Sequence, residues 1–161
     1  MSMRYFKPCK GYENCGIHLP ERSTCSSAGY DFFTAEKVTI PSSLPSLMDL
    51  IRGKVSLKPT IVYTHVKAKM RSNEFLAVYN RSSNPIRGLV LANGVGVVDS
   101  DYYSNKDNDG DIGFAFYNLS PCSLTLPAGY KIGQGIFQTF LKVDSDMTTT
   151  KREGGFGSTG E

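Results

Sequence analysis

The stretch that decides the fold of this chain is Asn93-Gly94-Val95-Gly96-Val97-Val98-Asp99-Ser100-Asp101-Tyr102. Two glycines give the backbone after Asn93 the freedom of a tight turn, and the β-branched valines are typical of a strand. Two carboxylates and a tyrosine follow at once. We therefore expect a hairpin that is fixed to a core and presents polar groups at its end. Taken alone, the stretch also fits an ordinary strand and turn.

Short apolar segments separated by Pro and Gly turns continue on both sides of this hairpin. We expect strands at 28–33, 36–41, 60–70, 75–79, 112–117, 123–126 and 131–141. A helix pattern is present at 43–53, which begins with serines and an early proline and stops at a glycine. Many short strands with one short, peripheral helix predict an all-β sandwich or jelly roll.

The composition limits the function classes. The 161 residues fit a single domain, with a net charge of +3 and a pI of about 8.6, which is too mild to predict a nucleic-acid ligand. Because no apolar run is long enough for a membrane span or a signal peptide, we expect a cytoplasmic protein with no membrane contact. Four cysteines with His18 leave zinc open as an alternative, but without a close Cys-x-x-Cys pair we expect free, partly buried thiols.

Polar side chains stand at three further places in the strand pattern. Asp31 alternates with aromatic neighbours, so its carboxylate points to the face opposite them. The run Arg81-Ser82-Ser83-Asn84-Pro85 groups a guanidinium, two hydroxyls and turn amides, which suits an anion such as phosphate. Gln134 lies between two glycines, so we expect its strand to allow a close approach. Each place also fits a plain structural role.

Two segments lack a core pattern. Residues 103–111 are rich in carboxylate and amide side chains; a calcium loop is an alternative, but no closing glutamate follows, and we expect an exposed loop. The tail, 144–161, is polar and rich in glycine, so we expect a mobile arm after a β core at 1–143. Its single aromatic, Phe156, could stack on a ring while the residues around it contact phosphates.

In their order and chemistry, five polar clusters closely resemble the motifs of the trimeric dUTP diphosphatase (dUTPase) family, of the Gram-positive bacterial or phage type. They are Ser27–Asp31, Arg81–Ser83, Asn93–Tyr102, Ile132–Gln134 and Arg152–Gly160. The resemblance implies a jelly-roll subunit, a homotrimer with active sites at subunit interfaces, and an arm that closes a neighbour's site. It also implies hydrolysis of dUTP to dUMP and pyrophosphate with Mg²⁺, which keeps uracil out of DNA and supplies dUMP for dTMP synthesis.

Roles follow from the resemblance by position. Asp99 is similar to the general base and Gln134 to a residue near the attacking water, while Asp31 resembles the carboxylate that holds Mg²⁺ through water. The residues implied in binding substrate are Arg81, Ser82, Ser83, Asn93, Gly96, Val98, Tyr102, Arg152, Phe156, Gly157, Ser158 and Thr159.

The chain departs from the family pattern in several places. Segments near 42–65 and 103–111 are longer than usual, Tyr130-Lys131 replaces an Asp-Arg or Asp-Lys pair, and Lys151 competes with Arg152 for the phosphate role. Phage members can bind repressor proteins under nucleotide control, so the resemblance also leaves open an added regulatory role through the two insertions. A deoxycytidine triphosphate deaminase is a further alternative, but no glutamate lies near Asn93–Tyr102.

Overall fold

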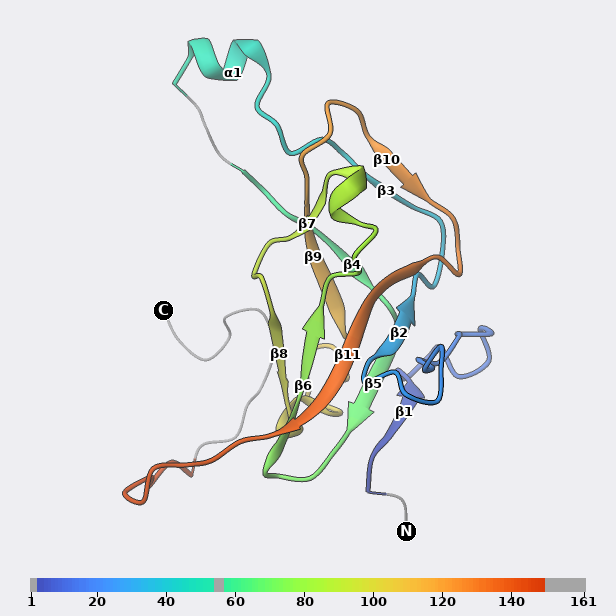
Figure 1. Ribbon diagram of the computed structural model, residues 1–161, viewed down its shortest axis with the longest axis vertical. Coiled ribbons are helices and arrows are strands. Elements are labelled where there is room, and N and C mark those ends of the chain that lie inside the picture. The colour runs from blue at the N-terminus through green and yellow to red at the C-terminus, as the bar shows by residue number, and fades with distance from the viewer. Residues whose placement is uncertain (1–2, 54–56, 150–161) are drawn as a thin grey trace.

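The computed structural model describes residues 3–53 and 57–149, and their regular structure is almost entirely β-strand (Figure 1). A four-stranded antiparallel sheet has the order β2 (Tyr30–Phe33), β11 (Lys131–Thr139), β6 (Glu74–Tyr79) and β8 (Gly96–Asp99). A three-stranded sheet has the order β4 (Thr60–Tyr63), β9 (Gly113–Asn118) and β7 (Leu89–Leu91). Two strand pairs complete the fold: β1 (Tyr5–Pro8) with β5 (Val66–Lys69), and β10 (Leu124–Leu126) with β3 (Val38–Ile40).

One hydrophobic core joins these sheets. Its fully buried members include Phe32, Ile40, Leu76, Leu89, Phe114, Phe116, Leu126 and Ile132. The groups that approach β11 closely are aromatic rings of this core. A Cβ atom at Gly133 would overlap the ring of Phe114, and one at Gly135 would lie 2.8 Å from the ring of Phe32. These two glycines therefore let aromatic rings pack under β11, rather than admitting a ligand to that face.

The helix is short and peripheral, as expected, but it covers only Leu47–Ile51 of the predicted 43–53. Ser46 caps α1 by accepting a hydrogen bond from the Asp49 amide at 3.1 Å, and the Asp49 carboxylate accepts one from the Ser46 amide in return. Figure 1 shows α1 projecting from the strands. No helix among residues 3–53 and 57–149 is long and apolar enough to cross a membrane.

The prediction of a single strand at 60–70 is wrong, because the range holds two strands, β4 and β5. The chain turns between β4 and β5, where His65 has a left-handed backbone with φ of 56°. Asp111 stabilises that conformation, because its carboxylate accepts a hydrogen bond from the His65 amide at 2.8 Å. The two halves of the predicted strand consequently join different sheets.

Candidate functional site

Asp31 and Gln134 lie opposite each other on the adjacent strands β2 and β11. Because Phe32 points into the core, Asp31 points to the outer face of the sheet, as the alternation predicted. A hollow of about 260 Å³ lies beside the pair, and Ser23, Ser27 and Ile136 also line it. The strand register thus brings together two residues that the sequence singled out 103 positions apart.

Asp31 is surrounded by cationic and hydroxyl groups. Its Oδ2 atom accepts hydrogen bonds from Lys131 Nζ at 2.7 Å and Ser23 Oγ at 2.6 Å, and Arg81 Nε lies 3.9 Å from Oδ1. Partial burial acts to raise the pKa of Asp31, but the hydrogen bonds from Lys131 and Ser23 outweigh it and lower the pKa. The carboxylate therefore stays ionised. From the sequence, Lys131 stood out only as part of a departure from the family pattern, and its contact with Asp31 was not predicted.

Arg81 begins a turn and is held by strand β11. Its Nη1 atom donates to the Lys131 carbonyl at 3.1 Å, and the turn continues through Ser82 and Ser83 into the 3₁₀ helix η1 (Pro85–Arg87). Asn84 is fully buried, and its amide donates to Ile132 O and Asn80 Oδ1, each at 2.8 Å. This buried asparagine anchors the turn against β11. Its place before proline was a turn signal, but nothing in the sequence revealed its burial.

The turn expected around Asn93 is present, but the paired hairpin is not: β7 pairs with β9 and β8 pairs with β6, so the strands on either side of the turn join different sheets. Gly94 has φ of 67°, and its amide donates to Leu91 O at 3.1 Å, which closes the turn. A Cβ atom at Gly96 would overlap Val78 and would lie 3.2 Å from the Asn93 amide nitrogen. Because β8 is an edge strand among the described residues, half of its N–H and C=O groups face away from β6.

Asp99 ends β8 opposite Phe75 and is half-buried, and the 3₁₀ helix η2 (Ser100–Tyr102) follows. Within η2, the Tyr102 side chain is buried with 6% of its surface exposed. The strand therefore delivers the carboxylate, while the short helix turns the tyrosine back into the protein.

The expectation that 103–111 is an exposed loop is only partly right: Ser104, Lys106 and Asp107 are exposed, but Asn105 and Asp111 are buried. The Asp111 carboxylate contacts His65 Nδ1 at 2.8 Å, and Asp109 Oδ2 accepts from Lys67 Nζ and the Lys10 amide, each at 2.6 Å. Burial raises the pKa of Asp111 although His65 opposes it. Lys67 thus pairs with the Asp109 carboxylate, which a calcium loop would need as a ligand. Among the described residues, no group of three acidic, His or Cys side chains is arranged to hold a metal ion.

Within one chain, Asp99 and Gln134 share the outer face of the four-stranded sheet but lie far apart. They are two strands apart across the sheet and four residues apart along it, which corresponds to about 16 Å. Between them the paired residues Ile136, Ala77 and Val97 form an apolar row, and Val97 is 59% exposed. The chain therefore carries two groups of predicted site residues. One holds Asp31, Arg81 and Gln134, and the other holds the turn at Asn93 and strand β8 with Asp99.

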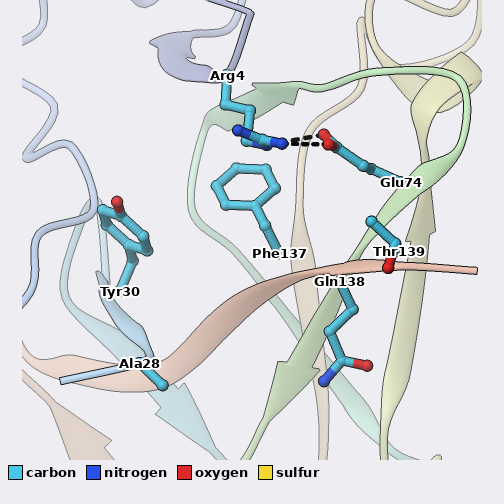
Figure 2. Close-up of a pocket in the computed structure, with 7 residues that line it drawn as sticks. All are labelled: Arg4, Ala28, Tyr30, Glu74, Phe137, Gln138 and Thr139. Atoms are coloured by element: carbon cyan, nitrogen blue, oxygen red, sulfur yellow. Dashed lines mark hydrogen bonds and ion pairs between the residues drawn. The ribbon is translucent and has the colours of Figure 1, made fainter.

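Figure 2 shows a second hollow, of about 270 Å³, beside the far end of β11. Arg4 Nε donates to Glu74 Oε2 at 2.8 Å, and Arg4 also pairs with Oε1. Glu74 is buried, and the hydrogen bond from Arg4 lowers its pKa, although its burial acts in the other direction. This ion pair ties the N-terminal segment to the end of the sheet.

Asp31 suits Mg²⁺ only through bound water. It is a single carboxylate that already contacts a lysine and a hydroxyl, whereas Mg²⁺ keeps several waters and binds through one or two carboxylates and substrate phosphates. The donor set thus fits the outer-shell role that the resemblance implies. The arm residues expected to bind substrate, with Lys151, lie outside the described residues.

A sequence profile of the dUTPase family matches residues 16–160. The chain belongs to the dUTPase family. It is 42% identical over 163 residues to the deoxyuridine 5'-triphosphate nucleotidohydrolase of Lactococcus lactis, an alignment that covers 99% of both chains. The dUTPase of Streptococcus mutans has a TM-score of 0.74 at 37% identity, covering 87% of this chain and 98% of that one.

A Staphylococcus bacteriophage 80alpha dUTPase has the same fold, with a TM-score of 0.66 at 15% identity over 93% of this chain and 98% of that one. It is described among phage dUTPases that control the transfer of virulence genes. The resemblance to the dUTPase family and the expected jelly-roll fold are both confirmed.

All four cysteines are free, with Cys9 buried and the other three exposed.

Proposed function

We propose that this dUTPase hydrolyses dUTP to dUMP and pyrophosphate through attack of a water molecule on the α-phosphorus. The observation that carries the proposal is the grouping of Asp31 on β2, Gln134 on β11 and Arg81 in the turn after β6, beside the sheet face that also bears Asp99. The family match supports the same substrate.

Asp99 is the proposed general base. A carboxylate can take a proton only from a water that it touches, and Asp99 ends a strand fixed to the core through Val98. Gln134 would orient the same water from the other group of residues. Its amide is restrained, since Nε2 donates to Asn80 O at 3.4 Å.

Arg81, Ser82 and Ser83 are proposed to grip the triphosphate. A guanidinium and two hydroxyls neutralise and orient phosphate oxygens, which brings the α-phosphorus in line with the water. Bound Mg²⁺ would supply further charge neutralisation, with Asp31 holding its water ligands. From the arm, Arg152, Ser158 and Thr159 would contact the distal phosphates, while Phe156 and Gly157 cover the base.

The turn at Asn93 and strand β8 are proposed to recognise uracil. Asn93 and the free edge of β8, from Gly96 to Val98, offer hydrogen-bonding groups to the uracil edge, and a narrow turn excludes the thymine methyl. Tyr102 would pack under the deoxyribose, where a ribose 2′-hydroxyl would clash. Together they reject dTTP, dCTP and UTP.

A homotrimer would complete the site. About 16 Å separates Asp99 from Gln134 in one chain, which is too far for both to touch one water. A second copy that covers the apolar row of Ile136, Ala77 and Val97 could place its own Asp99 beside this chain's Gln134. Val97, the exposed member of this apolar row, therefore supports a site shared between subunits.

Mixing two inactive variants tests the shared site. We expect Asp99→Asn to bind dUTP but to lose about 10²-fold to 10⁴-fold in turnover, and Gln134→Ala to be severely impaired. After the two are unfolded and refolded together, about a quarter of the shared sites pair an intact Asp99 with an intact Gln134, so activity should recover to about that fraction. Each variant refolded alone is the control. A failure to recover, in mixed trimers verified by mass, would place both residues in one subunit's site.

An added regulatory role remains a prediction. It is favoured by α1, where Met48, Leu50 and Ile51 expose at least half of their side chains away from the sheet. Displacement of a phage repressor from its operator, measured with and without dUTP, tests the role. The Ile51→Asp variant should keep hydrolysis but lose displacement. Displacement that is unchanged in this variant would exclude α1 as the contact.

A further inference from the structure

The Tyr102 side chain is held by the loop that follows it. The Tyr102 hydroxyl donates to the Asp111 carbonyl at 3.0 Å and accepts a hydrogen bond from Asn108 Nδ2 at 2.7 Å. The hydroxyl is the atom of the ring farthest from the backbone, so two hydrogen bonds there fix the tilt of the ring. The residues that supply these bonds belong to the insertion at 103–111.

Asn108 is itself held at both ends of its amide. Its Oδ1 atom accepts from the Gly110 amide at 3.1 Å and from Asn105 Nδ2 at 2.9 Å, which leaves Nδ2 facing Tyr102. Gly110 has φ of 86°, and a Cβ atom there would lie 2.7 Å from the Tyr102 carbonyl. The loop therefore closes tightly over its own tyrosine.

The insertion is also attached to the body of the protein. Asp111 contacts both the amide and Nδ1 of His65, and Asp109 contacts Lys67 and the Lys10 amide. The loop that supports Tyr102 is thus fixed from the opposite side by β5 and by the N-terminal segment. Such a support can hold a ring in place when a nucleoside presses on its other side.

We propose that Asn108 is a positioning residue that sets the discrimination between deoxyribose and ribose by fixing the ring of Tyr102. The inference rests on the proposed contact between Tyr102 and the deoxyribose. A 2′-hydroxyl is excluded sterically only when the ring cannot tilt away, so a looser ring admits UTP more readily while dUTP still binds. The insertion then serves substrate selection.

The test compares kcat/KM for dUTP and UTP in the wild type, Asn108→Ala, Tyr102→Phe and the double variant. Tyr102→Phe keeps the ring but removes the hydroxyl that Asn108 holds. We expect each single variant to lower the dUTP-to-UTP ratio about tenfold or more, and the double variant to lower it no further than Tyr102→Phe, because Asn108 acts through the hydroxyl that Tyr102→Phe removes. Asp107→Asn, an exposed change in the same loop, should leave the ratio unchanged.

If Asn108 is merely structural, Asn108→Ala should lower kcat/KM equally for dUTP and UTP and leave their ratio unchanged. That result would overturn the inference but not dUTP hydrolysis. Additive losses in the double variant would overturn it as well. If the folded wild type hydrolyses no dUTP, the proposed function fails instead, and the affinities of the same variants for dUMP and UMP, measured by calorimetry, decide the inference. An unchanged affinity ratio in Asn108→Ala would then reject it.

Discussion

A Cβ atom on Gly29 would lie 2.5 Å from Oε1 of Gln134. Gly29 therefore makes room for the end of a side chain that we place beside the attacking water. Because that end is flexible, an added methyl group displaces the glutamine without disturbing the core.

We expect Gly29→Ala to lower dUTP turnover by about 10-fold to 100-fold while the melting temperature stays close to that of the wild type. Steady-state kinetics and thermal unfolding check both parts. In a Gln134→Ala background, Gly29→Ala should lower dUTP turnover no further. A further loss in that background would show that Gly29 acts through another group.

Lys131 and Arg81 both face the Asp31 carboxylate. Lys131 Nζ lies 2.7 Å from Asp31 Oδ2, and Arg81 Nε lies 3.9 Å from Asp31 Oδ1. Without the lysine, Arg81 can close its gap to Asp31 and turn away from the phosphates. Lys131→Met should therefore raise KM for dUTP about tenfold with a smaller change in kcat, whereas Lys131→Arg should preserve KM. An unchanged KM in Lys131→Met would show that the lysine does not compete with Arg81.

The ion pair between Arg4 and Glu74 predicts a pH dependence of stability. The pKa of Glu74 lies below its ordinary value of 4.5 in the folded protein, so the unfolded chain binds the proton more tightly. The stability that the pair contributes is complete above about pH 4.5 and is lost as the pH falls through the lowered pKa. Glu74→Gln cannot titrate, so its melting temperature should fall less between pH 7 and pH 3 than that of the wild type. The exposed Glu36→Gln is the control, and equal falls in all three proteins would contradict the prediction.

The arm should serve the closed site and not the core. Removal of residues 151–161 should leave a folded trimer with severely reduced turnover, because the truncated protein cannot cover the base or contact the distal phosphates. Sedimentation and kinetics measure the two properties. Loss of the trimer on truncation would make the arm structural.

The elements that local pattern determines were predictable. Apolar alternation and β-branched residues located most strands, and the pattern at 43–53 located α1, although the helix begins only at Leu47. The break at His65 was hidden within a β-branched run, since the left-handed residue depends on Asp111, 46 positions away. Burial of the 103–111 loop was missed for the same reason: its partners Lys10, His65 and Lys67 are distant in sequence.

The candidate site shows the same limit. Resemblance to a family identified Asp31, Gln134 and Asp99, but not the strand register that pairs the first two and separates the third. The contact of Lys131 with Asp31 and the burial of Asn84 depend on that register as well. Such contacts are tertiary, so no local pattern in the sequence carries them.

The proposed specific hydrolysis of dUTP is tested most directly by measuring pyrophosphate release by the purified protein from dUTP, dTTP, dCTP and UTP, each with Mg²⁺. The proposed uracil contacts of the turn at Asn93 and of β8, together with Tyr102, predict strong release from dUTP and little from the other three. Release of pyrophosphate from none of the four by a correctly folded trimer would contradict the account, and would mean that the site binds nucleotide without hydrolysing it.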